Sequence, residues 1–129
     1  ARGWLTEQGV EKIHAEIEIR LAKDGAKITK FYFCPHHPEA NLEKYRIVCD
    51  CRKPATGLFE KAAKKYNINL KKSYVVGDSF RDIEAGKKLG AKTIAVESGS
   101  SGFSDSKPDY KVNDLYAAVQ LILRREKLT

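Results

Sequence analysis

The spacing of apolar residues predicts a helix followed by a strand in the first third of the chain. Apolar side chains recur at intervals of three and four over 7–23, which is typical of an amphipathic helix. Thr6 is a suitable N-cap for this helix, and Gly25 is expected to end it. The following segment, KITKFYF (27–33), is rich in β-branched and aromatic residues and predicts a strand that runs into Cys34.

Helical and extended patterns continue to alternate in the rest of the chain. Leu115, Val119 and Ile122 are expected to form the packing side of the last helix. Strands that alternate with helices predict an α/β fold, a Rossmann-like parallel sheet flanked by helices on both faces. Ligands bind such sheets at the carboxyl ends of the strands, where Cys34, Asp78 and Glu97 are expected. We expect helices over 57–66, 80–89 and from 115 onward, and strands over 73–77, 91–96 and 110–112.

Composition narrows the class of protein. A chain of 129 residues with 42% apolar content suffices for a single domain, expected over 1–129. A net charge of +7 favours anionic partners, either phosphorylated metabolites or nucleic acid. Three cysteines cannot all pair, and no apolar run has the length of a signal peptide or a membrane span. The sequence therefore predicts a cytoplasmic protein without a membrane partner.

The three cysteines gather in one stretch, CPHHPEANLEKYRIVCDCRKP. Cys34 and His36, then twelve residues, then Cys49 and Cys51 supply three thiolates and one imidazole. This is the ligand set of a closed tetrahedral site for structural Zn²⁺, which would clip the loop 34–51. His37 directly follows His36 and is the alternative imidazole ligand.

Two further motifs point to phosphate chemistry. The sequence VVGDSFRD (75–82) places Asp78 after a buried strand, where its carboxylate would suit Mg²⁺, while Asp82 would either cap the next helix or support the site as a second acceptor. Directly after the last cysteine, Arg52 and Lys53 could deliver a guanidinium and an ammonium group to a substrate phosphate.

Taken with these motifs, the chain resembles the D-glycero-D-manno-heptose 1,7-bisphosphate 7-phosphatases of the haloacid dehalogenase superfamily over nearly its whole length. CPHHPEANLEKYRIVCDCRKP, YVVGDSFRDIEAGKKLGAKTIAV and the opening ARGWLTEQGVEKIHAEI carry the resemblance. The related histidinol-phosphatase domains generally have a shorter stretch between the cysteine pairs, so the twelve residues favour the heptose enzyme.

The resemblance implies a function and a set of site residues. The function is Mg²⁺-dependent hydrolysis of the 7-phosphate of the heptose bisphosphate through an aspartyl-phosphate, in nucleotide-activated heptose and lipopolysaccharide core synthesis. The expected partner is the small phosphorylated sugar substrate, and the intact enzyme is expected to be a monomer. Family members with Lys at position 79 use it on the substrate; here it is Ser79, and Arg81 is the candidate substitute. The implied residues are Arg52 for substrate, Lys53 for substrate and catalysis, Asp78 for Mg²⁺ and catalysis, and Cys34, His36, Cys49 and Cys51 for Zn²⁺.

One departure from the family concerns the nucleophile. The superfamily attacks phosphorus with the first Asp of an Asp-x-Asp pair, and the 129 residues contain no such pair. The chain thus resembles the carboxyl-terminal two thirds of the enzyme, a domain truncated at its amino terminus whose sheet is incomplete because the amino-terminal strands are absent. On this interpretation the isolated chain is expected to be inactive and to fold poorly.

Two alternatives remain open at this point. One is a histidinol-phosphate phosphatase or another phosphatase of small phosphometabolites. The other is a nucleic-acid-binding zinc module, motivated by the net charge, the cysteine cluster and KKYNINLKK (64–72). One-residue gaps inside the ligand pairs and little aromatic interleaving count against the second, so no nucleic-acid partner is expected.

Overall fold

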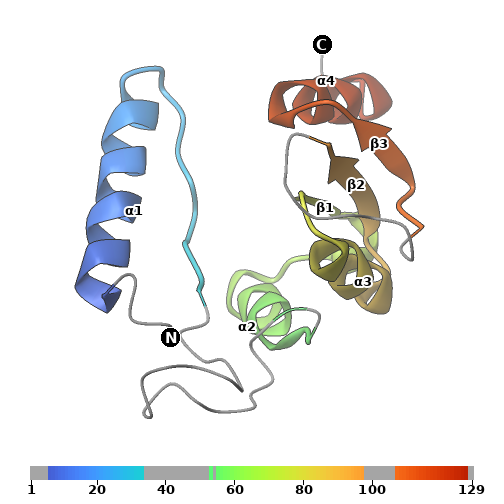
Figure 1. The fold of residues 1–129 in the computed structure, drawn as a ribbon, viewed down its shortest axis with the longest axis horizontal. Helices are drawn as coiled ribbons and strands as arrows, with labels where there is room; N and C mark the ends of the chain where they lie inside the picture. Colours follow the sequence, from blue (N-terminus) through green and yellow to red (C-terminus); the bar gives the residue numbers. More distant parts are fainter. Residues whose placement is uncertain (1–5, 34–52, 54, 98–106, 128–129) are drawn as a thin grey trace. The chain divides into compact units, whose positions relative to one another are not determined.

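The structure is a computed structural model that describes residues 6–33, 53, 55–97 and 107–127 (Figure 1). The chain divides into two compact units, Ala1–Arg52 and Lys53–Thr129, which are described separately. The zinc-binding loop predicted over 34–51 lies outside the described residues, and the expected single domain over 1–129 stays a prediction. Among the helices that the structure describes, none is both long enough and apolar enough to cross a membrane.

The first unit contains the predicted amphipathic helix, α1 (Glu7–Ala22). It begins as expected, because the Thr6 hydroxyl accepts a hydrogen bond of 2.9 Å from the backbone N–H of Gly9. After the helix, Gly25 adopts a left-handed conformation with φ of 75°, which a glycine tolerates without strain. No residue of α1 is buried within the described part of the chain.

The strand predicted over 27–33 is wrong, because these residues form no β-ladder. The segment instead contacts α1 through its aromatic side chains. The His14 ring stacks on Phe31, with ring centroids 4.2 Å apart and planes 10° from parallel, and meets Phe33 edge-on at 6.0 Å. A strand needs a hydrogen-bonded neighbour, and no described strand pairs with this segment.

The second unit is built on a three-stranded parallel sheet in the order β1-β2-β3. The strands are β1 (Tyr74–Gly77), β2 (Lys92–Val96) and β3 (Tyr110–Val112). Val76 of β1 pairs with Ile94, and Ile94 in turn pairs with Tyr110. Both ladders are parallel, so the predicted parallel α/β architecture is confirmed for this unit.

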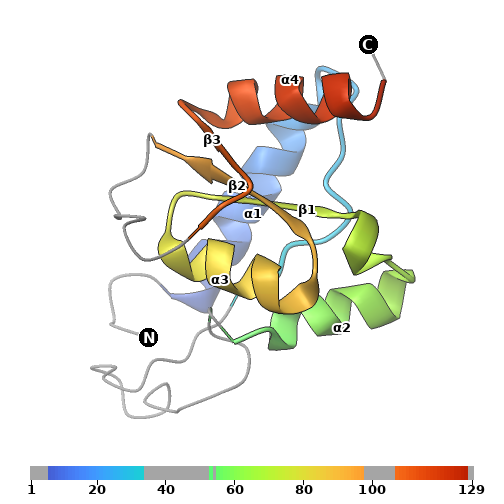
Figure 2. The same cartoon turned by 90° about the vertical axis from the view of Figure 1, so that its right-hand side faces the viewer.

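Helices cover the two faces of the sheet, with α3 (Phe80–Leu89) on one side and α4 (Leu115–Arg125) on the other (Figure 2). Side chains alternate between these faces along each strand. On the α3 side, Gly86 lets the helix approach closely: a Cβ atom there would lie 2.6 Å from Cγ2 of Thr93. On the α4 side, the core is formed by Ile94, Val96 and Ala118.

The packing face predicted for α4 is wrong in part. Ile122 packs on the core as expected, together with Leu121, but Leu115 and Val119 are 62% and 43% exposed. Asp114 caps the helix by accepting a hydrogen bond of 2.8 Å from the N–H of Ala117, and Ala118, in the next position, is fully buried against the sheet. The remaining elements are α2 (Gly57–Tyr66), which has the predicted bounds, and the short 3₁₀ helix η2 (Leu70–Lys72).

Candidate active site

The carboxyl edge of the sheet carries two of the predicted ligand-binding positions. Asp78 directly follows β1, and Glu97 directly follows β2. Both residues are exposed, as the approach of a ligand to this edge requires. Cys34, the third residue expected here, lies outside the described residues.

The turn from β1 into α3 is fixed by a capping box. The Ser79 hydroxyl accepts a hydrogen bond of 3.3 Å from the N–H of Arg81, and the Asp82 carboxylate accepts one of 3.3 Å from the N–H of Ser79. Both capping side chains are buried, at 9% and 6% exposure. This reciprocal arrangement satisfies backbone donors that the first helical turn leaves without partners. It holds the backbone that directly follows Asp78 in place.

Gly77 makes room for the Asp82 carboxylate. A Cβ atom at position 77 would lie 2.2 Å from Oδ2, 2.3 Å from Cβ and 2.4 Å from Cγ of Asp82. No side chain larger than hydrogen fits there while Asp82 keeps its position. The glycine of the Gly-Asp pair is therefore required by the close approach of Asp82, and its φ angle is not in the left-handed region.

Lys53 reaches this turn across 29 positions of sequence. Its Nζ atom donates a hydrogen bond to Oδ1 of Asp82 and forms an ion pair with that carboxylate. The Lys53 side chain is 47% exposed and that of Asp82 is 9% exposed. One carboxylate thus holds two groups at once, the start of α3 through Oδ2 and the Lys53 ammonium group through Oδ1.

The pairing of Lys53 with Asp82 could not be predicted from the sequence. The sequence leaves two roles open for Asp82, a helix cap or a second acceptor in the site. The structure shows both contacts, because the two oxygens of the carboxylate serve different partners. The sequence predicts Lys53 as a site residue, but no periodicity or motif links it to a particular carboxylate.

Arg81 lies in the first turn of α3, beside this pair. Its guanidinium carbon is 5.2 Å from the centroid of the Phe80 ring, a cation–π contact. Phe80 is 37% exposed, and Arg81 is half-buried. None of the carboxylates in the described part of the chain forms an ion pair with Arg81.

The predicted metal and substrate residues are only partly described. Arg52 and the four expected zinc ligands, Cys34, His36, Cys49 and Cys51, lie outside the described residues. Within the ranges that are described, no three His, Cys, Asp or Glu side chains form a group that could hold a metal ion. Among the described residues, Asp78 is thus an exposed carboxylate that belongs to no preformed group of three potential metal ligands.

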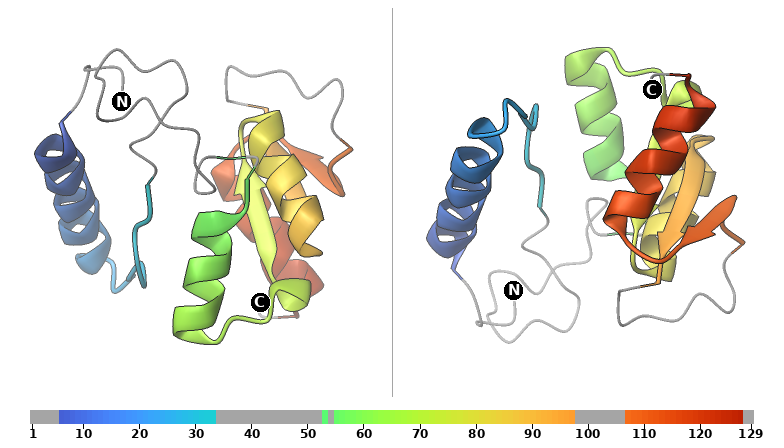
Figure 3. Two further views of the ribbon diagram at one scale, coloured as in Figure 1. Left: turned by 90° about the horizontal axis from the view of Figure 1, so that it is seen from below. Right: turned by 90° about the horizontal axis from the view of Figure 1, so that it is seen from above.

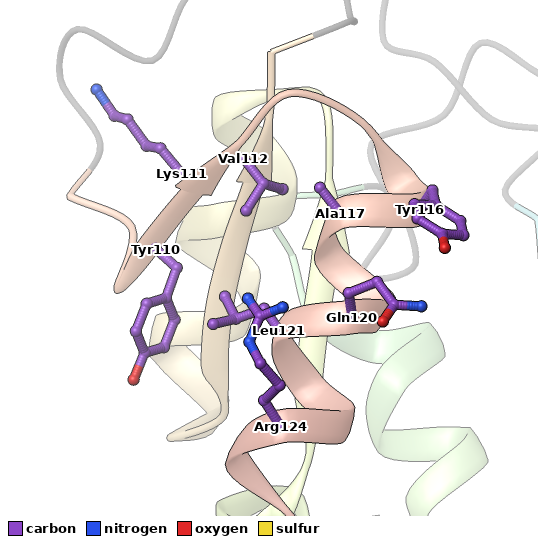
Figure 4. Close-up of a pocket in the computed structure, with 8 residues that line it drawn as sticks. All are labelled: Tyr110, Lys111, Val112, Tyr116, Ala117, Gln120, Leu121 and Arg124. Atoms are coloured by element: carbon purple, nitrogen blue, oxygen red, sulfur yellow. The ribbon is translucent and has the colours of Figure 1, made fainter. Parts of the chain in front are cut away.

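A separate hollow of about 410 Å³ lies between β3 and α4, away from these residues (Figure 4). Val112, Ala117 and Leu121 form its apolar floor, and Tyr110 and Arg124 lie at its side. Neither Lys53 nor Asp78, the predicted site residues that the structure describes, lines it. We therefore place the candidate active site at the turn after β1 and not in this hollow.

Comparison with known proteins connects this site to a family. A model of HAD-hydrolase-like proteins matches residues 50–118, the range that contains Lys53, Asp78 and Asp82. D-glycero-beta-D-manno-heptose-1,7-bisphosphate 7-phosphatase from Escherichia coli O6:H1 is 33% identical over 98% of this chain and 68% of its own length. The proteins of the same name from Haemophilus ducreyi and Rhodopseudomonas palustris are 36% and 40% identical, over 95% and 75% of this chain and 69% and 54% of their own lengths.

A solved structure supports the same relationship. The D,D-heptose 1.7-bisphosphate phosphatase from B. bronchiseptica, crystallised in complex with magnesium and phosphate, matches with a TM-score of 0.74 at 26% identity. The match covers 96% of this chain and 68% of that one. The parallel sheet, the Gly-Asp turn after β1 and these similarities agree, and the chain belongs to the HAD-like D-glycero-beta-D-manno-heptose-1,7-bisphosphate 7-phosphatase family.

Proposed function

We propose that the enzyme formed with these residues hydrolyses the 7-phosphate of D-glycero-D-manno-heptose 1,7-bisphosphate with the help of Mg²⁺. The observation that carries the proposal is the Lys53–Asp82 ion pair in the turn that also contains Asp78. The names of the relatives support the substrate. We also propose that the intact enzyme is a monomer and that it acts in nucleotide-activated heptose synthesis.

Lys53 is proposed to stabilise the charge on the transferring phosphoryl group. A lysine ammonium group has three N–H donors, and the pair with Asp82 occupies one of them. Because nearly half of the Lys53 side chain is exposed, the other donors can reach a phosphate oxygen. Asp82 would be a positioning residue, since its own hydrogen bond to Ser79 fixes where it holds the ammonium group.

Asp78 is proposed to hold Mg²⁺. This ion is usually bound through one or two carboxylates together with water and substrate phosphates, so one exposed carboxylate at the carboxyl edge fits it. When bound, Mg²⁺ would neutralise charge on the phosphate oxygens. The B. bronchiseptica structure, a complex with magnesium and phosphate, supports this choice of metal.

The attacking group is proposed to come from outside the 129 residues, because they contain no Asp-x-Asp pair. Its carboxylate would form an aspartyl-phosphate as the bond from phosphorus to the sugar oxygen breaks, and water would then release phosphate. Arg52 and Arg81 are proposed to bind the substrate, where guanidinium groups would suit a phosphate geometrically.

We also propose that Cys34, His36, Cys49 and Cys51 bind structural Zn²⁺. The support is the ligand set and its spacing, since all four residues lie outside the described ranges. Metal analysis of the purified chain should give about one zinc per chain, the ratio of a single closed site. The Cys49→Ser variant should lose most of it, whereas His37→Ala should retain it. Loss of zinc with His37→Ala and retention with His36→Ala would reassign the imidazole ligand.

The activity is tested by phosphate release from heptose 1,7-bisphosphate, with ³¹P NMR to show which phosphate leaves. The chain alone should give no release above the Mg²⁺ background. After addition of a segment that carries the family's Asp-x-Asp, it should release the 7-phosphate. Lys53→Ala and Asp78→Asn should then lower kcat by at least about a hundredfold. Activity of the chain alone would overturn the proposal on the nucleophile, and silence after addition would overturn the function.

A further inference from the structure

One strongly basic surface of the second unit has no part in the proposed reaction. Residues 64–72, KKYNINLKK, connect the end of α2 to η2, and we refer to them as the lysine turn. Four of the nine residues are lysines, and all four are exposed. The sequence between Glu60 and Asp78 contains no acidic residue that could offset their charge locally.

The lysine turn has a defined conformation. Asn67 ends α2 in the left-handed region with φ of 54°, and the N–H of Ile68 donates a hydrogen bond of 3.0 Å to the carbonyl of Ala63. The Asn69 side chain accepts a hydrogen bond of 3.1 Å from the N–H of Lys71, and the backbone carbonyl of Asn69 accepts one of 2.7 Å from the Ser73 hydroxyl. A partner would therefore meet a preorganised surface and would not have to order it.

Two apolar side chains stand at the tip of the lysine turn, between the two lysine pairs. Tyr66 is 37% exposed and Ile68 is 43% exposed. The ammonium nitrogen of Lys65 lies 5.6 Å from the centroid of the Tyr66 ring. Aromatic and aliphatic side chains flanked by lysines are typical of segments that bind at the interface of a membrane.

The lysine turn lies at the end of the sheet opposite Asp78. It precedes the first residue of β1, whereas Asp78 follows the last one, and both Figure 2 and Figure 3 show α2 and η2 meeting at this end. The carboxyl end of α3 adjoins it, because a Cβ atom at Gly90 would lie 3.6 Å from Cγ of Lys71. Lys87 and Lys88 in the last turn of α3 extend the basic surface.

The lysines could serve only to complement the dipoles of the helices, but this role explains only part of the basic surface. Lys64 and Lys65 lie in the last turn of α2, where cations are favourable. Lys71 and Lys72 belong to a 3₁₀ helix of three residues, which has almost no dipole to complement. Nor does a dipole account for Tyr66 and Ile68, whose apolar side chains remain in contact with water.

We propose that the lysine turn binds the surface of an anionic lipid bilayer. The lysines would contact the lipid headgroups, while Tyr66 and Ile68 would enter the interfacial region. Nucleic acid fits less well, because single-stranded chains need several aromatic platforms and a duplex offers no apolar region for Ile68. The expectation of no membrane partner rests on the lack of a long apolar run, which concerns spanning and not contact at the surface. In this orientation the edge with Asp78 would face away from the lipid.

The test is co-sedimentation of the full chain with vesicles of phosphatidylcholine containing about 30% phosphatidylglycerol, against vesicles of phosphatidylcholine alone. Each lysine close to an anionic surface contributes roughly fivefold to partitioning. Replacing Lys64, Lys65, Lys71 and Lys72 together by Gln should thus weaken binding by up to about 600-fold, if all four lysines lie close to the surface. The control carries the same change in net charge on the first unit: Gln at the exposed positions Lys12, Lys23, Lys27 and Lys30.

Salt dependence and a variant of the apolar residues separate the electrostatic from the apolar contribution to membrane binding. Binding should fall steeply from about 0.05 to about 0.5 M salt, because the screening length shrinks from about 10 Å at 0.1 M toward about 3 Å at 1 M. Tyr66→Ser with Ile68→Ser should weaken binding several-fold without changing the circular dichroism spectrum. Equal weakening by the two lysine variants, or no preference for anionic vesicles, would overturn the proposal. Tighter binding to random duplex DNA than to vesicles, lost in the same variant, would assign the surface to nucleic acid instead.

Discussion

Gly77→Ala is the most direct probe of the turn that carries the candidate site. The new Cβ atom would lie 2.2 Å from Oδ2 of Asp82, well inside the closest approach of real Cβ atoms, so the carboxylate must move. Asp82 would then give up its hydrogen bonds with the N–H of Ser79 and with Lys53. The change thus removes a cap and a positioning contact with a single methyl group.

The loss of stability caused by Gly77→Ala can be worked out from the two groups whose hydrogen bonds it would break. A buried N–H and a buried carboxylate without partners cost about 2 kcal/mol together, and the displaced backbone adds about 1 kcal/mol. The Lys53 pair adds little to stability because the lysine is half exposed and screened by solvent. We therefore expect destabilisation by about 3 kcal/mol, which corresponds to about a hundredfold change in a local opening equilibrium.

Hydrogen–deuterium exchange of peptides that span 74–90 measures this opening. Exchange in Gly77→Ala should accelerate about a hundredfold or reach the unprotected rate. Gly25→Ala, a glycine substitution in the first unit, is the control. In the double variant with Asp82→Gly, the additional effect of Gly77→Ala should disappear, because the overlapping atoms are gone. Acceleration of less than about threefold in the single variant would refute the packing argument.

Two other contacts give predictions for stability. The Tyr74 hydroxyl donates a hydrogen bond of 2.6 Å to Glu126, which raises the pKa of Tyr74 above its ordinary value of 10.0. The contribution of this hydrogen bond to the stability of the fold should be present below about pH 10 and should vanish as the pH rises through the raised pKa. The difference in urea midpoint between wild type and Tyr74→Phe should therefore narrow above about pH 10, and a difference that is constant with pH would contradict this. The Thr93 hydroxyl accepts a hydrogen bond of 3.0 Å from the N–H of Asp109 and donates one of 3.2 Å to its carboxylate. Thr93→Val should cost about 1–2 kcal/mol in the same titration, more than Thr56→Val at the N-cap of α2, where the side chain makes no capping hydrogen bond, and equal effects would contradict that assignment.

The helices could be predicted from the sequence because their signals are local. Thr6 marks the start of α1 as expected, α1 ends at Ala22, shortly before Gly25, and α2 and α3 begin and end where the periodicity places them. The pattern of Leu115, Val119 and Ile122 predicts a helix correctly but gives it the wrong packing face. Several stripes of α4 are apolar, and only the position of the sheet decides which one is buried.

The other differences between the sequence-based predictions and the structure arise from interactions between residues far apart in the sequence. KITKFYF has strong β propensity, but a ladder needs a partner, and within the described residues the segment packs on His14 instead. The ion pair of Lys53 with Asp82 joins two residues that no local pattern connects. The Gly-Asp motif predicts an exposed carboxylate at the carboxyl edge, whereas the reason for its glycine, the close approach of Asp82, required the structure.

The tight contact of α3 with the sheet has a consequence for the order of folding. β1, α3 and β2 are consecutive in the chain, and Gly86 of α3 meets side chains of Val75 and Thr93, which are only 11 and 7 positions away in the sequence. Because loops of this length close rapidly, the segment 74–96 is expected to be structured in the transition state before β3 and α4 join it. Ile83→Val should then slow folding, while Ile122→Val should mainly speed unfolding in stopped-flow experiments. If Ile122→Val slowed folding and Ile83→Val mainly sped unfolding, the folding nucleus would lie in α4. Equal effects of the two variants on the folding rate would indicate a diffuse folding nucleus.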